Sequence, residues 1–84
     1  MDSLFERLDR AEKQIAVVKN KQARRDLMKM VTTIDIAITS ADMESVECRR
    51  LKKETLKYRD LVAQAESFLD NLEKHITFAA LLNG

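Results

Sequence analysis

The chain has 84 residues, no proline, one glycine (Gly84), one cysteine and a net charge of +1 with 35% charged residues. A chain of this size forms one small domain, and without interior helix breakers it favours long helices over strands and tight turns. The balanced charge lacks the basic excess of a dedicated nucleic-acid-binding protein, and no run approaches the ~20 apolar residues of a membrane span. We expect one all-α domain over residues 1–84, located in the cytoplasm, where a single cysteine stays reduced.

Two apolar stripes occupy the first half of the chain, separated by a polar interruption at 19–22. The first comprises Leu4, Leu8, Ala11, Ile15 and Val18, and the second comprises Leu27, Val31, Ile34 and Ile38, flanked by Ala23, Met30 and Ala37. At ~3.6 residues per turn the two stripes would face opposite sides of a straight helix. Either the chain bends near Asn20, which would give a three-helix arrangement, or one long helix uses two faces. We favour a continuous or mildly kinked helix.

The predicted turn lies at 39–42. Thr39, Ser40 and Asp42 are small or capping residues that follow a strongly apolar run, and such residues commonly start a new helix. We therefore expect helix one over residues 4–39 and helix two over residues 42–81. Because a short connection makes neighbouring helices antiparallel, the predicted fold is an antiparallel two-helix hairpin with coiled-coil-like packing.

The second half of the chain carries an unbroken heptad stripe, with alternating spacings of three and four residues that are typical of a coiled-coil seam. Its members are Cys48, Leu51, Thr55, Tyr58, Val62, Ala65, Leu69, Leu72, Ile76 and Ala79. A flanking row widens this face toward that of a bundle helix with two neighbours; it consists of Leu61, Phe68, His75 and Leu82. A helical partner is therefore expected to bind at Leu61, Val62, Phe68, Leu69, Leu72, Ile76, Phe78, Leu81 and Leu82.

The reactive side chains form no recognisable catalytic, metal or cofactor site. His75 is the only histidine, and no set of metal ligands surrounds it in sequence, so we interpret it as a half-buried residue at the seam edge. Cys48 occupies a seam position, where cysteine behaves as a small hydrophobe. Most carboxylates have a basic residue within one helical turn, which is typical of solvated helix pairs. We expect a non-enzymatic protein without metal or cofactor.

Basic residues form two clusters, Lys19, Lys21, Arg24 and Arg25, and then Arg49, Arg50, Lys52, Lys53 and Lys57. A hairpin folded near residue 40 would bring the two clusters together into one positive patch. Such a patch can bind phosphates, but no aromatic residues are interleaved for base stacking. If nucleic acid binds, we expect the binding to be weak, independent of sequence and abolished by moderate salt.

The chain opens with Leu-Phe-Glu-Arg-Leu at residues 4–8, and it is short and helical with one predicted polar turn. In this layout it resembles the small co-chaperones of bacterial type III secretion needle subunits. The resemblance covers essentially the whole chain but includes no signature motif. The chain is somewhat longer than the family pattern, and the 19–22 interruption departs from it. The resemblance implies a cytoplasmic protein that pairs with a larger helical-repeat chaperone and keeps a polymerising needle subunit monomeric.

The sequence thus predicts a protein-interaction module, a small chaperone or adaptor that binds a helical partner through the apolar face of helix two. Two alternatives stay open. Copies of the hairpin could pair into a self-assembling four-helix-bundle scaffold, or the basic patch could bind nucleic acid without sequence preference. Concentration-dependent mass distinguishes the scaffold, and salt-sensitive duplex binding distinguishes the nucleic-acid binder.

Overall fold

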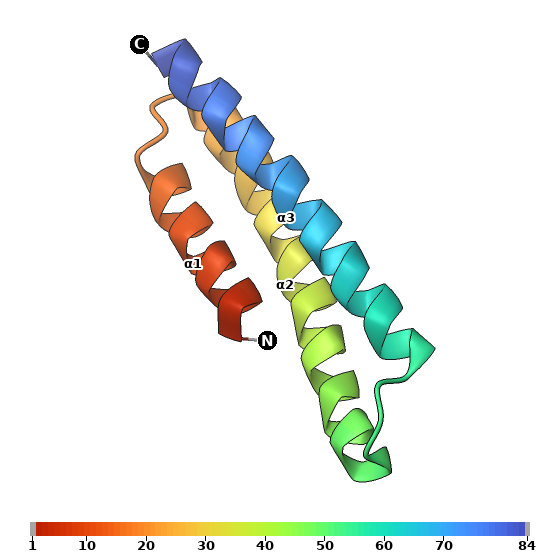
Figure 1. The fold of residues 1–84 in the computed structure, drawn as a ribbon. Coiled ribbons are helices and arrows are strands. Elements are labelled where there is room, and N and C mark those ends of the chain that lie inside the picture. Colours follow the sequence, from red (N-terminus) through yellow and green to blue (C-terminus); the bar gives the residue numbers. More distant parts are fainter. Residues whose placement is uncertain (1, 84) are drawn as a thin grey trace.

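The computed structural model describes residues 2–83, with the side chains of residues 3–81. Within this part the chain forms three helices and no strand: α1 (Asp2–Ala16), α2 (Lys21–Leu51) and α3 (Leu56–Asn83). The helices run up, down and up in a slender bundle with principal extents of 50 × 17 × 15 Å (Figure 1). The all-α class is confirmed. The predicted two-helix hairpin is not observed. The structure has the three-helix arrangement that we expected only if the chain bends near Asn20.

The chain breaks between α1 and α2, so the expectation of a continuous or mildly kinked first helix is wrong. Asn20 has extended backbone (φ −72°, ψ 118°), and its side-chain oxygen accepts a 3.0 Å hydrogen bond from the Ala23 N–H, which makes it the N-cap of α2. Arg24 donates a 2.8 Å hydrogen bond to the Val18 carbonyl oxygen across the connection. Because the two apolar stripes differ in phase, this break allows both to face one core.

The predicted turn at 39–42 is wrong, since α2 continues through it without interruption. The Ser40 hydroxyl donates a 2.9 Å hydrogen bond to the Ile36 carbonyl oxygen one helical turn earlier. A serine bonded in this way is accommodated inside a helix and does not act as a cap. Ala41 is fully buried and follows Ile38 in the inward-facing row, so packing also favours helix here.

The chain turns at 52–55 instead. Lys52 adopts the left-handed conformation (φ 57°, ψ 34°), and its N–H donates to the Arg49 carbonyl oxygen. The N–H of Lys53 donates to the Cys48 carbonyl oxygen at 3.1 Å. These two bonds form a Schellman motif, which usually has glycine at the left-handed position. A lysine at that position explains why no glycine marked the turn in the sequence.

Thr55 begins α3 by capping it. Its Oγ1 accepts a 3.1 Å hydrogen bond from the Tyr58 N–H, as threonine does at an N-cap. The heptad stripe predicted to run unbroken from Cys48 is therefore divided between two helices. The predicted bounds of helix one (4–39) and helix two (42–81) are wrong because the chain breaks between α1 and α2 and turns at 52–55.

The apolar stripes of all three helices meet in one core. Its buried members are Leu4, Leu8, Ala11, Ile15, Val18, Leu27, Val31, Ile34, Ala37, Ile38, Ala65, Leu69, Leu72, Ile76 and Ala79. Packed against its edge are Ala23, Met30, Val62 and Phe68. Every member of the two predicted stripes in the first half of the chain lies in or against this core. The helical periodicity therefore predicted the inward-facing positions correctly although it misplaced the turn.

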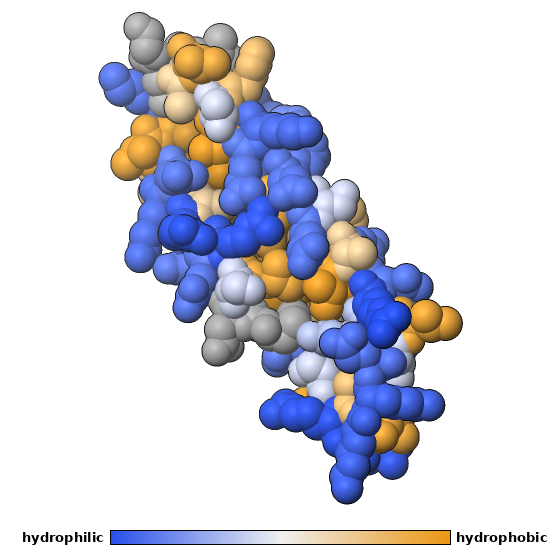
Figure 2. Space-filling model, in the orientation of Figure 1, coloured by the Kyte–Doolittle hydropathy of each residue, from blue (hydrophilic) through white to orange (hydrophobic). Residues whose placement is uncertain are grey.

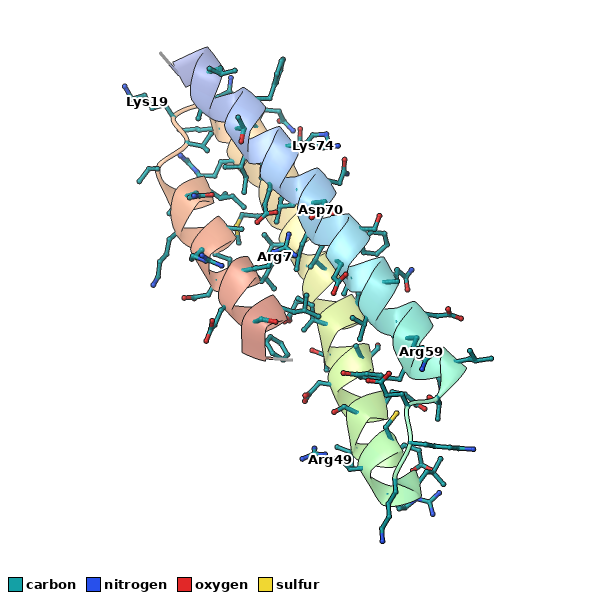
Figure 3. All side chains as sticks on the ribbon, viewed as in Figure 1. Arg7, Lys19, Arg49, Arg59, Asp70 and Lys74 are labelled. Carbon is teal, nitrogen blue, oxygen red and sulfur yellow. The ribbon has the colours of Figure 1, made fainter. Side chains whose placement is uncertain are left out.

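A polar contact holds α1 on α3. The Arg7 guanidinium donates hydrogen bonds to Asp70 at 2.9 Å and to Glu73 at 2.6 Å. Arg7 and Asp70 are labelled on the two facing helices in Figure 3. Both bonds raise the pKa of Arg7 above its usual value, and the bond to Glu73 has the larger effect. The Arg7 side chain is 25% exposed, so water only partly screens the contact.

The third helix covers only part of the α2–α3 pair. α1 has 15 residues, whereas α2 has 31 and α3 has 28. The main core begins at Leu4 on α1 and at Ala65 on α3, and it ends at Ile38 on α2. Nearer the α2–α3 turn, Ala41 and Cys48 are buried outside this cluster. That half of the bundle is two helices thick (Figure 1).

Candidate interaction site

The predicted partner face lies largely inside the protein. Leu69 and Leu72 are fully buried, and Ile76 is 6% exposed. These side chains belong to the core that α1 and α2 share with α3, so they are not available to another chain in this fold. Three further members are half-buried between core and solvent, namely Leu61, Val62 and Phe68.

The predicted residues near the end of α3 are exposed. Phe78 is 64% exposed and Leu81 is 74% exposed. Leu82 lies within α3, but its side chain is outside the described part of the chain. Phe78 and Leu81 are therefore the members of the predicted face that remain open to a partner.

A second apolar stripe lies on the outer side of α2, away from the core. It consists of exposed residues with no charged residue among them, namely Met28, Thr32, Ile36, Thr39, Met43 and Val46. Their spacing of three or four residues places them on one side of the helix, opposite the buried row. Ile36, Met43 and Val46 are 63%, 70% and 57% exposed. This outer stripe extends for roughly 27 Å at ~1.5 Å per residue.

Sequence reasoning missed the outer stripe because of the turn predicted at 39–42. That turn would assign Met28 and Ile36 to one helix and Met43 and Val46 to another. The spacing of the stripe is readable from the sequence, but only on a helix that continues from Met28 to Val46. The misplaced turn therefore concealed the longest exposed apolar feature of α2.

His75 and Cys48 have ordinary structural surroundings. His75 is exposed and not half-buried as predicted, and its Nδ1 lies 2.8 Å from the Asn71 carbonyl oxygen. Cys48 is 8% exposed, and its Sγ lies 3.6 Å from the Thr55 hydroxyl. Among the described residues, no group of three or more His, Cys, Asp or Glu side chains could hold a metal ion.

The two basic clusters lie at opposite ends of the bundle, so the predicted single positive patch is wrong. Lys19 and Arg49, one from each cluster, mark the two ends in Figure 3. Because the chain turns at 52–55, the start of α2 lies beside the end of α3. Arg24 and Arg25 are consequently far from the basic residues of the turn.

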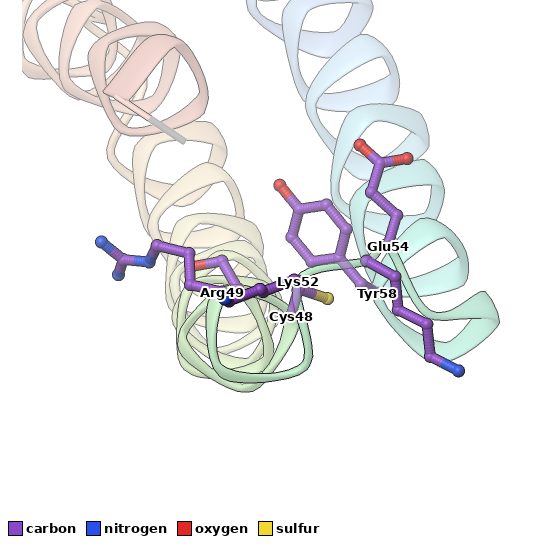
Figure 4. A pocket seen from close by; sticks show the side chains of 7 residues that line it. Cys48, Arg49, Lys52, Glu54 and Tyr58 are labelled. Carbon is purple, nitrogen blue, oxygen red and sulfur yellow. The ribbon is translucent and has the colours of Figure 1, made fainter.

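An open hollow of about 500 Å³ lies beside the α2–α3 turn (Figure 4). We call it the turn hollow; it is lined by Ser45, Cys48, Arg49, Lys52, Lys53, Glu54 and Tyr58. The Tyr58 ring extends from α3 toward α2, and the Cys48 sulfur points from α2 toward α3 (Figure 4). The hollow therefore has an apolar floor between the helices and a largely basic rim.

The carboxylates around the turn already pair with other cations. Glu47 pairs with Arg50, whose hydrogen bond lowers the pKa of the Glu47 carboxyl. Two further pairs join Lys57 to Glu44 at 3.6 Å and Arg59 to Glu54 at 3.3 Å. Among the described residues, no carboxylate pairs with the three basic side chains of the turn hollow, which are Arg49, Lys52 and Lys53.

Comparison with protein-family models, curated proteins and solved structures finds no match to this chain. Within the described residues, no helix combines the length and apolar character needed to span a bilayer. On the face shown in Figure 2, apolar patches interrupt a mainly polar surface near the upper end and midway along the bundle. The candidate surfaces are the outer stripe of α2, the exposed residues Phe78 and Leu81 of α3, and the turn hollow.

Proposed function

We propose that the protein is a non-enzymatic interaction module that binds an amphipathic helix of a partner protein along the outer stripe of α2. The observation that carries this proposal is a charge-free, exposed stripe at helical spacing on a helix whose opposite side is already packed. In a chain with 35% charged residues, a purely solvated helix face would normally carry charges. Extended exposed apolar surface of this kind marks interaction sites.

The dimensions and chemistry of the outer stripe suit a helix. Its three- and four-residue spacing is that of a coiled-coil seam, so a partner helix can lie along it with knobs-into-holes packing. Complete burial of one such side chain contributes ~1.5–3 kcal/mol. Ile36, Met43 and Val46 together can therefore offset much of the loss of freedom on association.

A partner with a different sequence fits the outer stripe better than a second copy does. Two copies could pair through antiparallel α2 helices, with Ile36 of one copy opposite Thr39 of the other. In this alignment the residues that flank the stripe bring like charges together. Asp35 of one copy would face Asp42 of the other. Like charges at these positions oppose pairing.

A small chaperone or adaptor role is the narrower form of this proposal. It derives from the resemblance to type III secretion needle co-chaperones, which imply a helical-repeat chaperone and a needle subunit as partners. Co-expression with such a pair tests it: the needle subunit should stay monomeric only when this chain is present. The three-helix arrangement differs from the two-helix layout that the resemblance assumed. The general proposal of a helix-binding module rests on the outer stripe and does not depend on the chaperone role.

The proposal can be tested by photo-crosslinking in the cells from which the protein comes. A benzoylphenylalanine at Met43 should give a discrete crosslinked product of higher mass, because a partner covers that position. The same group at Lys13, whose side chain is 77% exposed on α1, is the matched control and should give none. Ile36→Ser should abolish the Met43 product without changing the helical circular dichroism signal. Equal products at both positions, or none at Met43, would overturn the proposal.

A further inference from the structure

We propose a second docking site in the groove between α2 and α3 beside their turn, where a short acidic amphipathic helix of a partner protein lies in line with α1. This site goes beyond the proposed function, because it lies on a different surface from the outer stripe and selects for negative charge. Three observations support it, namely the continuation of the groove that α1 fills, the incomplete burial of its floor, and the unpaired basic rim.

The turn hollow continues the groove in which α1 packs. Val31 and Ile38 of α2 are buried in the core to which α1 contributes Leu4, Leu8, Ala11 and Ile15. Ser45 follows these two residues at a seven-residue step, so it continues the same side of α2 toward the turn. α1 itself stops short of this level, since its first buried residue, Leu4, belongs to a cluster that reaches only to Ile38 on α2.

The floor of the groove is incompletely covered where α1 is absent. Ala65 and Leu72 of α3 are fully buried in the core to which α1 contributes. Tyr58, which continues the same row at seven-residue spacing toward the turn, is only half-buried. Val62 is half-buried in the same way. A helix laid over these residues would complete the three-helix packing that already exists in the other half of the bundle.

The rim of the groove determines the charge of the occupant. Arg49, Lys52 and Lys53 line the turn hollow, and the carboxylates Glu44, Glu47 and Glu54 already pair with other basic residues. An incoming helix with Asp or Glu on its flanks would therefore find available partners. Complementary rim charges of this kind favour encounter and select against basic helices.

The size of the groove limits the occupant to about three helical turns. The segment of α2 beyond the main core, 39–51, covers roughly 20 Å at ~1.5 Å per residue. α1, with 15 residues, occupies the remainder. The occupant is thus a short helix with one apolar stripe, and a long coiled-coil partner would collide with α1.

The test uses the full chain and two synthetic 12-residue peptides, which match the length of the groove at ~1.5 Å per residue. Both carry leucines at positions i, i+3 and i+7, one with glutamates on the flanks and the other with lysines at the same places. We expect the acidic peptide to bind and the basic one to bind at least about tenfold more weakly. Amide shifts in nitrogen–proton NMR spectra should centre on Ser45, Cys48 and Tyr58. Absence of binding by the acidic peptide at millimolar concentration would overturn the site.

Matched variants separate a specific site from general attraction. Arg49→Gln with Lys53→Gln should weaken the acidic peptide about tenfold, whereas Lys21→Gln with Arg25→Gln removes the same charge at the far end and should leave affinity unchanged. Equal losses in both variants would overturn the proposal. So would a concentration-dependent doubling of mass with the same amide shifts, since the occupant would then be a second copy. Ile36→Ser, which disables the outer stripe, should not alter peptide binding, so failure of one proposal is distinguishable from failure of the other.

Discussion

The Arg7 guanidinium on α1 donates a 2.6 Å hydrogen bond to the Glu73 carboxylate on α3, across 66 residues of sequence. Asp70 accepts a second bond from the same Arg7 nitrogen at 2.9 Å. This contact joins α1 to α3 beside the shared core, in which Leu69 and Leu72 of α3 are buried. An α1 displaced from this position would expose Leu69 and Leu72.

Replacing Arg7 should weaken the docking of α1. We expect Arg7→Met to reduce the free energy of unfolding by about 1 kcal/mol, because the partner carboxylates are partly exposed and solvent screens the pair. Urea denaturation followed by circular dichroism measures the change. In a double-mutant cycle with Glu73→Gln, the two losses should add to more than the loss in the double variant. Additive losses would show that the Arg7–Glu73 pair contributes nothing to stability.

The start of α2 depends on Asn20. Its side chain satisfies the Ala23 N–H, so Asn20→Ala should reduce stability by about 1 kcal/mol. Asn20→Asp should retain or increase stability, since the first turn of α2 has no acidic residue to complement the helix dipole. Thermal unfolding of both variants measures these effects. A loss in Asn20→Asp equal to that in Asn20→Ala would contradict the capping role.

The α2–α3 turn should be improved by a glycine. Lys52 occupies the left-handed conformation at φ 57°, which strains any residue with a Cβ. Lys52→Gly should therefore raise the free energy of unfolding by about 0.5–1 kcal/mol after allowing for the greater flexibility of glycine in the unfolded chain. Lys53→Gly is the control, because Lys53 has no positive φ, and it should give no increase. Urea midpoints compare the two.

Core and exposed leucines of α3 should respond differently to truncation. Leu72 is fully buried and Leu81 is 74% exposed. Leu72→Ala should cost ~2–5 kcal/mol in the free energy of unfolding. Leu81→Ala should stay within about 0.5 kcal/mol. Similar losses in the two variants, measured in guanidinium, would show that the end of α3 is buried in solution by something other than this chain.

The sequence predicted which side of each segment faces inward better than it predicted where the chain turns. Every member of the two stripes before Ile38 lies in or against the core, because the helical period determines a face without reference to the rest of the fold. The turn was misplaced because Ser40 resembles a cap in sequence but bonds to the Ile36 carbonyl oxygen inside the helix. Side-chain bonding of this kind depends on the backbone around it, which periodicity does not report.

The candidate site was predictable only in part, for the same reason. Phe78 and Leu81 were expected at a partner surface and are exposed, whereas Leu69 and Leu72 were expected there and lie in the core. Their pattern is that of any residue on an apolar helix face. Whether such a face lies in the core or forms a binding surface depends on whether another helix of the same chain packs against it.

By itself, the sequence determined that this chain is helical and that the two stripes in its first half face inward, whereas Leu51 of the third stripe is 41% exposed. The absence of interior glycine and proline and the repeated three- and four-residue spacing suffice for that. Only the tertiary structure decided that α1 packs against the predicted partner face, that α2 continues to Leu51, and that an outer stripe and a basic groove remain exposed. The physical reason is that burial is settled by competition among all apolar faces of the chain, and α1 is long enough to cover only part of the α2–α3 pair.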